Sequence, residues 1–379
     1  MTLFFILVFL LYSVVLLVLT WGWLLFDASR PLKVVRPDDR LLSVVIAFRN
    51  EQIAIPSLLK DLDAQRYGKE NVEIILVNDH STDESVALIG KANYPNLTLL
   101  QLPEGKTGKK AALDWGIKNA KGHIIIVTDM DCHLSAKWLI TINDCFHSDK
   151  IKMVVGPVRI DPSGSLFSKM QSLEFSSLVG TSGATLALGQ PTMCNGANLS
   201  FLKSAYMEVY GYEGNETIPS GDDEFLMRKI AARWKDSVRF LYDPNAVVST
   251  AAQTSWSEFF NQRLRWASKW KYNSSFVTQL TAIAVLVFHM CFLSLFVFVA
   301  TGTIDWRDSL ILWSIKMSCE ALFLYRVGFF LGLRWSWSSF LALQFTHSLY
   351  VVVVGILSQV RGYNWKGRRW NPLKATPIH

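Results

Sequence analysis

Two aspartates, Asp129 and Asp131, stand one residue apart directly after the apolar run "HIIIVT" at 123–128. Alternation along an extended chain places both carboxylates on the same side, where they repel each other unless a cation lies between them. Oxygen ligands without cysteine or histidine at metal spacing favour Mg²⁺ or Mn²⁺, and Mg²⁺ of this kind usually serves substrate phosphates. The D-x-D pair therefore predicts a divalent-metal site for a phosphate-bearing substrate.

A second group of acids, Asp222, Asp223 and Glu224, opens a segment of helical periodicity. Acids in the first turn of a helix often do no more than complement the helix dipole. Three adjacent acids are more than the helix dipole requires. Their mutual repulsion raises the pKa of at least one carboxyl group, which suits a general base. We therefore expect a proton acceptor among Asp222, Asp223 and Glu224.

Two further turns carry charged groups, and a helix cap is an alternative interpretation of the acidic turn at Asp79. Asp79 follows the apolar run 72–77, and Lys109 lies in the basic turn "EGKTGKKAAL" before another helical segment. The basic turn lacks the G-x-x-x-x-G-K-[ST] spacing of a Walker-type loop. Lys109 or the nearby amides can still approach a diphosphate at the start of a helix, although solvated surface lysines are an equally good interpretation.

The elements that position these residues alternate between strands and helices. Short β-rich apolar runs predict buried strands at 42–47, 72–77, 97–102 and 123–128. Segments of helical periodicity lie between them, at 52–65, 83–92 and 108–120. This order predicts an α/β fold with right-handed crossovers and a mostly parallel sheet covered on both faces. Ligands bind beyond the carboxyl ends of the strands in such sheets, where the polar residues above lie.

The composition is unusual for a soluble protein, because 50% of the 379 residues are hydrophobic and only 18% are charged. The formal net charge of +7 suits anionic lipid headgroups or phosphate-bearing substrates. Since the chain has no dense block of lysine and arginine, nucleic acid is not an expected partner.

The excess apolar residues are concentrated at the two ends of the chain. We expect a transmembrane anchor at 1–26, a basic linker at 27–40, the α/β domain at 41–255, an interfacial amphipathic helix at 256–275, two or three transmembrane segments within 276–358 and a basic tail at 359–379. The segment 309–333 contains Lys316, Glu320 and Arg326, so it either crosses the membrane with paired charges or lies at the interface.

The positions of the basic residues predict the orientation. Cytoplasmic flanks carry an excess of Lys and Arg, and basic residues follow the first apolar segment and precede the second. The α/β domain is therefore expected in the cytosol, at the plasma or inner membrane if the source is bacterial. The basic tail is expected on the same side, which requires one of the later apolar segments not to cross.

The stretch "FFNQRLRWASKW" at 259–270 combines cations and tryptophans beside an apolar segment. On a helix, Gln262, Arg265 and Trp266 fall on one face, while Arg263 is expected to point elsewhere. An interfacial helix with snorkelling cations explains the composition, and a face that closes an active site explains the spacing. Both interpretations can hold for one helix.

These motifs, taken in order, resemble the inverting family-2 glycosyltransferases, which have a GT-A nucleotide-sugar fold. The resemblance rests on an Asp after the second strand, a D-x-D after the fourth, an acidic pair before a helix and Q-x-x-R-W before an apolar run, and it covers roughly 41–270. The membrane-embedded branch of this family includes cellulose, chitin and hyaluronan synthases and ceramide glucosyltransferase. The tail "NWKGRRW" is similar to the W-[KR]-G-R ending of ceramide- and hopanoid-type enzymes.

The resemblance implies a role for each matching residue. It implies nucleotide contacts for Arg49, Asn50, Glu51, Asp79 and Asp129, with Asp79 at the uracil end of the nucleotide. Asp131 matches the metal ligand, with Asp129 beside it. Donor sugar or acceptor contacts are implied for Asn195, Gly196 and Asn198 of "CNGANLSF", and for Gln262 and Trp266.

The catalytic roles follow from the same resemblance. Asp223 matches the base of the family's E-D-x-x-L motif, and Asp222 replaces its Glu, so the choice between these acids stays open by one residue. Arg265 matches the residue that binds the leaving diphosphate.

The resemblance implies metal-dependent, inverting transfer of a sugar from a nucleotide-sugar, with a UDP-sugar favoured, to a membrane lipid or glycan. The few apolar segments favour a single transfer to a lipid. The alternatives are a processive polysaccharide synthase and, from another class, a non-catalytic membrane accessory or binding protein of the same fold. The sequence does not predict an oligomeric state.

Overall fold

The computed structural model describes residues 1–28, 40–92, 94–146, 148–214, 221–268, 276–365 and 368–370. Most of the expected basic linker and basic tail lies outside these described residues, as do Lys269 and Trp270. The chain forms two compact units. The α/β unit comprises Ala28–Ile160 and Thr185–Ala251, and the helical unit comprises Met1–Asp27, Asp161–Ala184 and Ala252–His379.

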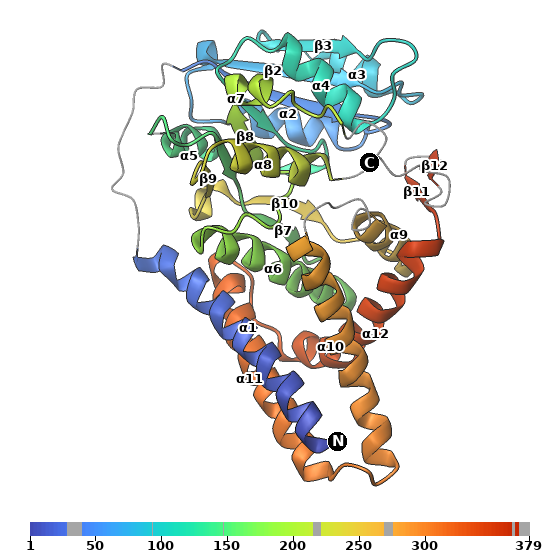
Figure 1. Cartoon of the computed structure of the whole chain (residues 1–379). Coiled ribbons are helices and arrows are strands. Elements are labelled where there is room, and N and C mark those ends of the chain that lie inside the picture. The colour runs from blue at the N-terminus through green and yellow to red at the C-terminus, as the bar shows by residue number, and fades with distance from the viewer. Residues whose placement is uncertain are drawn as a thin grey trace. The chain divides into compact units, whose positions relative to one another are not determined.

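The α/β unit contains a seven-stranded sheet in the order β3-β2-β1-β4-β8-β6-β9 (Figure 1). Its strands are β1 (Leu42–Phe48), β2 (Val72–Asn78), β3 (Leu97–Gln101), β4 (Ile124–Val127), β6 (Met153–Val155), β8 (Leu199–Leu202) and β9 (Val238–Phe240). β1 pairs in parallel with β2 and β4, and β2 pairs in parallel with β3. β8 is antiparallel to both β4 and β6. The expected mostly parallel sheet is confirmed, with β8 as the reversed strand.

The helices of this unit follow the sequence pattern. α2 (Ile55–Asp63), α3 (Ser85–Lys91) and α4 (Lys109–Asn119) lie within the three segments of predicted helical periodicity. The remaining elements are η1 (Lys69–Asn71), α5 (Trp138–Cys145), α7 (Lys203–Glu208), α8 (Asp222–Arg233), η2 (Pro244–Ala246) and a small sheet of β5 (Cys132–His133), β10 (Val248–Ala251) and β7 (Val158–Asp161).

The centre of the sheet is covered on both faces, because consecutive residues of β1, which point to opposite sides, are equally buried. Val44, Val45 and Ile46 are each 0% exposed. α4 covers one face through Gly116, where an added Cβ would lie 2.5 Å from a methyl carbon of Val45 and 2.9 Å from one of Val77. This close approach fixes α4, and with it Lys109 at its first position, above β1 and β2.

Among its described residues, the helical unit contains three helices long and apolar enough to cross a membrane, over Thr2–Phe26, Gln279–Ala300 and Trp337–Val360. Its described elements are α1 (Thr2–Ala28), most of α6 (Leu166–Ala187), α9 (Trp256–Ser268), α10 (Phe276–Ala300), α11 (Trp306–Phe330), α12 (Trp337–Val360) and the strands β11 (Tyr363–Trp365) and β12 (Arg368–Trp370). α6 lies within the range expected for the α/β domain, yet it groups with the membrane helices. The reason is close packing at Gly180, where an added Cβ would lie 2.6 Å from Val327 of α11.

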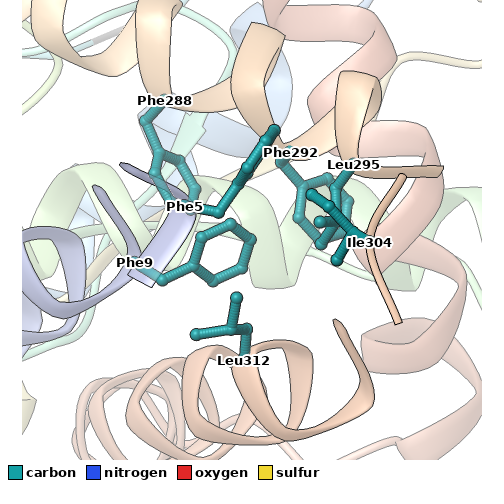
Figure 2. Close-up of a cluster of buried hydrophobic side chains, with 7 residues drawn as sticks. All are labelled: Phe5, Phe9, Phe288, Phe292, Leu295, Ile304 and Leu312. Carbon is teal, nitrogen blue, oxygen red and sulfur yellow. The ribbon is translucent and has the colours of Figure 1, made fainter. Parts of the chain in front are cut away.

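α11 runs alongside α1 in the same direction (Figure 1). Figure 2 shows one end of this packing, a buried cluster of Phe5, Phe9, Phe288, Phe292, Leu295, Ile304 and Leu312 from α1, α10, α11 and the α10–α11 connection. At the other end, the rings of Trp23 and Phe330 lie 5.4 Å apart. α11 therefore packs along a helix that is long and apolar enough to cross a membrane, although α11 itself carries charged residues.

A polar network inside the helices explains how α11 accommodates these charges. Lys316, which is 2% exposed, donates hydrogen bonds to Glu320 at 2.8 Å and to Gln344 of α12 at 2.9 Å. Tyr12 of α1 donates to the other oxygen of Glu320 at 2.8 Å. The i,i+4 pair that the sequence suggested is therefore formed, and it joins three helices.

We expect Lys316→Met to destabilise the protein by about 3–5 kcal/mol, because it leaves Glu320 buried without its cation. Thermal unfolding in detergent measures the loss. The control is Lys316→Met combined with Glu320→Gln, which removes both charges and is expected to recover most of the stability. Equal melting temperatures for wild type and Lys316→Met would show that the pair does not hold the helices together.

The C-terminal half of α12 packs against α9. Leu264 of α9 and Val354 of α12 form a buried cluster, with Phe260, Ala267, Tyr350 and Leu357 packed against it. Because α9 directly precedes α10 in the chain, α12 ends at the end of the helical unit where α10 begins. α10 runs away from this end of the helical unit and α11 runs back toward it. The last turns of α12 then lie at this end as well, beside α9 (Figure 1).

Candidate active site

Hydrogen bonds join the turn that follows β1 to the turn that follows β2. Arg49 Nη1 donates to the backbone carbonyls of Asp79 at 2.8 Å and His80 at 2.9 Å. Asn50 accepts from Thr82 N at 2.8 Å, and Glu51 N donates to Ser85 Oγ at 2.8 Å. The predicted nucleotide-contacting residues of these turns thus lie in one place, at the carboxyl ends of two neighbouring parallel strands.

Asp79 links this pair of turns to the start of α4. Its side chain is 2% exposed, and its Oδ2 accepts a hydrogen bond from Gly108 N at 3.1 Å. Gly108 has a φ of +99°, a conformation that glycine adopts without strain. Because Gly108 directly precedes Lys109, Asp79 fixes the point from which the Lys109 side chain extends.

Lys109 reaches the aspartates after β4. Its Nζ lies 2.5 Å from Asp129 Oδ1, and both side chains are partly exposed. The D-x-D pair forms a turn rather than a continuation of the strand, with Met130 2% exposed between the two acids and Asp131 exposed to solvent. The interpretation of Lys109 as a solvated surface lysine is therefore wrong, because the ammonium is held at the sheet edge among acids.

The acidic start of α8 meets the "NGAN" segment at the same place. Asp223 accepts hydrogen bonds from Gly196 N at 2.9 Å and from Glu224 N at 2.8 Å, one on each carboxylate oxygen. A Cβ added to Gly196 would lie 3.7 Å from both Asp223 Oδ2 and Lys109 Nζ. Lys109, Asp129, Gly196 and Asp223, drawn from four segments of the α/β unit, therefore converge.

The charges of this cluster act on one another. Burial lowers the pKa of Lys109, but the nearby Asp129, Asp222 and Asp223 raise it further than burial lowers it. Lys109 therefore stays charged at neutral pH. Burial raises the pKa of Asp222, Lys109 lowers it, and Asp223 raises it, with a net pKa above the ordinary value. The predicted raised pKa in the acidic group thus falls on Asp222.

The donor set fits a hard divalent cation bound together with a phosphate. Asp129 and Asp131 offer carboxylate oxygens on either side of a buried Met130, and no group of three or more His, Cys, Asp or Glu side chains capable of holding a metal occurs in the described part of the chain. A site with only two protein carboxylates leaves coordination positions for phosphate oxygens and water, as Mg²⁺ and Mn²⁺ sites at nucleotides require.

The two asparagines of the "NGAN" segment have different surroundings. Asn195 is partly exposed and accepts from Ala197 N at 2.9 Å. Asn198 is 1% exposed, donates to the carbonyls of Pro157 and Ala246 at 2.8 Å each, and accepts from Trp138 Nε1 at 3.0 Å. Asn195 is therefore placed to meet a ligand, whereas the side chain of Asn198 is fully used in holding the loop.

We expect Asn198→Ala to destabilise the protein by about 2–4 kcal/mol, because it leaves the buried Trp138 N–H and two carbonyls without partners. Thermal unfolding of the purified protein measures this loss. The matched control is Asn195→Ala, which removes one bond at a partly exposed site and is expected to leave the melting temperature nearly unchanged. The reverse order of the two effects would contradict the distinction.

α9 belongs to the helical unit, and its motif residues are described within that unit. Gln262, Arg265 and Trp266 are all partly exposed. The expectation that Arg263 points away from them is wrong, because its Nη1 donates to Gln262 Oε1 at 2.6 Å and its guanidinium lies 4.3 Å from the Trp266 ring centroid. A sequence signal was present: Phe259 and Trp266, at i−4 and i+3, place Arg263 on an aromatic face.

The fold and this site define an α/β unit of the GT-A type. The chain superposes on a mannosyltransferase, PcManGT from Pyrobaculum calidifontis, described in complex with GDP-Man and Mn²⁺, with a TM-score of 0.57. The match covers 91% of this chain and 97% of that chain at 15% sequence identity, so it supports the fold alone.

The family follows from sequence. Residues 43–210 match the family model of Glycosyl transferase family 2, and the chain therefore carries a domain of that family. The chain is 30% identical over 276 residues to a poly-beta-1,6-N-acetyl-D-glucosamine synthase of Staphylococcus aureus (strain COL), covering 68% of this chain and 64% of that protein. A synthase of the same name from Staphylococcus epidermidis is 27% identical over 249 residues, covering 64% of this chain and 57% of that protein. The chain spans less than two thirds of the length of these relatives.

Proposed function

We propose that the chain is a membrane-bound, inverting glycosyltransferase that moves a sugar from a nucleotide-sugar to an acceptor at the cytosolic face. The observation that carries this proposal is the convergence of Lys109, Asp129, Gly196 and Asp223 in a domain of glycosyl transferase family 2. A non-catalytic accessory protein would not need a cation, carboxylates and an open glycine placed together at the ligand-binding edge of the sheet.

The nucleotide binds at the two hydrogen-bonded turns that follow β1 and β2. Asp79 and the turn at Arg49, Asn50 and Glu51 contact the base and ribose, with Asp79 at the uracil end if the donor is a UDP-sugar. This proposal is supported by the hydrogen bonds that join Arg49 and Gly108 to Asp79 and so fix the position of the Asp79 side chain. Lys109, charged and held by Asp129, offers its ammonium to the diphosphate.

Asp131, with Asp129 beside it, would hold Mg²⁺ or Mn²⁺, which supplies positive charge to the leaving diphosphate when bound. The protein residues perform the remaining steps. Asp223, oriented by two backbone N–H groups, takes the proton of the acceptor hydroxyl. The acceptor oxygen attacks the anomeric carbon, the bond from that carbon to the diphosphate oxygen breaks, and the configuration inverts.

The resemblance to the family assigns substrate contacts to three residues of α9 in this proposal. Arg265 stabilises the charge that develops on the leaving diphosphate, and Trp266 and Gln262 contact the acceptor. All three side chains are partly exposed within the helical unit, which leaves them accessible to substrate.

The orientation follows from the basic residues beside the apolar helices. The α/β unit lies in the cytosol, at the plasma or inner membrane if the source is bacterial. α12 ends at α9, the helix before α10, so in this proposal the tail lies on the side of the membrane from which α10 starts. α1, α10 and α11 cross the membrane, and α12 is the segment that returns without a net crossing.

Two acceptors are compatible with the site. The relatives named poly-beta-1,6-N-acetyl-D-glucosamine synthase favour a growing polysaccharide and an N-acetylglucosamine donor. The small number of candidate crossing helices in the described chain favours one transfer to a membrane lipid. We give the glycan acceptor precedence, because the sequence match extends over 68% of the chain.

The test is an assay of the purified protein in detergent with a panel of radiolabelled nucleotide-sugars, Mn²⁺ or Mg²⁺, oligosaccharide primers and a membrane lipid extract. Label in long oligomers identifies a polysaccharide synthase, and label that migrates with lipid identifies a glycolipid synthase. Nucleotide-sugar binding without transfer to any acceptor would overturn the proposal in favour of a binding protein.

A further inference from the structure

Arg263 is the most buried cation of α9. Its residue is 2% exposed, although it lies in a helix whose neighbouring motif residues are partly exposed. It forms an ion pair with Glu174 of α6, and the two side chains are 2% and 5% exposed. A guanidinium this far from water is tolerated because a carboxylate faces it.

The guanidinium of Arg263 contacts two residues of the Q-x-x-R-W motif. Its Nη1 donates to Gln262 Oε1 at 2.6 Å. Its Cζ lies over two aromatic rings, 4.3 Å from the Trp266 centroid and 4.7 Å from the Phe259 centroid. Trp266 is further bounded by Phe175 of α6, with ring centroids 5.7 Å apart. Arg263 therefore fixes the orientation of both side chains through contacts that only a planar, forked cation makes together.

Glu174 extends this arrangement to the membrane helices. While one carboxylate oxygen faces Arg263, the other accepts a hydrogen bond from Tyr350 of α12 at 3.3 Å. One buried carboxylate thus joins α6, α9 and α12. Beside this carboxylate, the buried side chains of Leu264 and Val354 add an apolar contact between α9 and α12.

We propose that Arg263 is a positioning residue, which holds Gln262 and Trp266 in the orientation that receives the acceptor, and that Glu174 anchors it. This inference rests on the proposed function. A purely structural ion pair is the alternative, but a buried ion pair adds little stability over an apolar pair of similar size. Among the described residues, Arg263 Nε also has no hydrogen-bond partner, so the side chain is not optimised for stability alone.

The test compares wild type with Arg263→Lys and with the double variant Glu174→Met/Arg263→Met, which removes both charges and keeps the side-chain volume. Both are expected to melt near the wild-type temperature. Both are expected to lose about tenfold in kcat/KM for the acceptor, because a misaligned acceptor platform weakens the reactive geometry. The KM for the donor is expected to be unchanged, since Arg263 does not contact the nucleotide turns in this proposal.

A spectroscopic measurement makes the inference independent of turnover. In protein labelled with 5-fluorotryptophan, the Trp266 resonance is assigned by its loss in Trp266→Phe and is expected to shift or broaden in both Arg263 variants. An unchanged Trp266 resonance, or wild-type acceptor kinetics in the double variant, overturns the positioning role. Absence of transfer by wild type overturns the proposed function instead, and the fluorine spectrum then decides whether Arg263 orients Trp266.

Discussion

Replacing Asp223 with asparagine is expected to lower the rate of sugar transfer by about a thousandfold, the range found when a general base is removed. Asparagine has nearly the same shape and keeps an oxygen that accepts from Gly196 N or Glu224 N, which bind the two carboxylate oxygens now. It cannot take the proton of an acceptor hydroxyl. Initial rates at saturating donor and acceptor measure the loss, and calorimetric titration with nucleotide is expected to give wild-type affinity.

Asp222→Asn is the matched control, because Asp222 is the adjacent acid at the start of the same helix. Its pKa is raised, chiefly by burial, and it lies close to Lys109. We expect a smaller loss, since its removal changes the field around Lys109 and leaves the proton acceptor in place. An inactive Asp222→Asn protein beside an active Asp223→Asn protein would transfer the role of base to Asp222.

The strands and helices of the α/β unit were predictable from sequence because their signals are local. Runs such as "VEIILV" are both β-branched and bounded by polar turns, and they form β2 over Val72–Asn78. The end of each parallel strand then placed Asp79 and Asp129 at one edge of the sheet. The reversed strand β8 (Leu199–Leu202) was not predicted, because strand direction depends on the connection that precedes it.

The ion pair of Arg263 and the hydrogen bonds of Asn198 could not be predicted, because the partners are distant in the chain. Glu174 lies 89 residues before Arg263, and the carbonyl partner of Asn198 at Ala246 lies 48 residues after it. Sequence spacing indicated which residues share a face of α9 and which residues neighbour one another in the "NGAN" segment. It contained no information on which distant residues pack against them. A motif that looked like a ligand contact at Asn198 is therefore a structural support.

The same limit applied to α11. Its charges made an interfacial segment as reasonable as a crossing helix, because the sequence paired Lys316 only with Glu320. Tyr12 and Gln344, which complete the network, come from α1 and α12. Chemistry of this kind belongs to the assembled helices rather than to one segment.

Asp131→Asn is expected to lower the transfer rate by at least about a hundredfold, or roughly 2.7 kcal/mol of barrier, since it removes an anionic ligand of the proposed metal site. The change preserves the size of an exposed side chain, so the melting temperature is expected to stay close to that of wild type. Raising the Mn²⁺ concentration is expected to restore part of the rate, because the weakened site then fills. Rates across a metal titration measure both effects.

Chelation tests the same site without a substitution, and Asp129→Asn separates the two acids of the motif. EDTA is expected to abolish transfer by wild type, and added Mn²⁺ or Mg²⁺ is expected to restore it. Because Asp129 also binds Lys109 at 2.5 Å, Asp129→Asn is expected to weaken nucleotide binding even without metal, whereas Asp131→Asn is expected to weaken only the metal-dependent part of that binding. Full activity in EDTA, with metal-free protein verified by elemental analysis, would remove the cation from the proposal and leave Lys109 and Arg265 to neutralise the diphosphate.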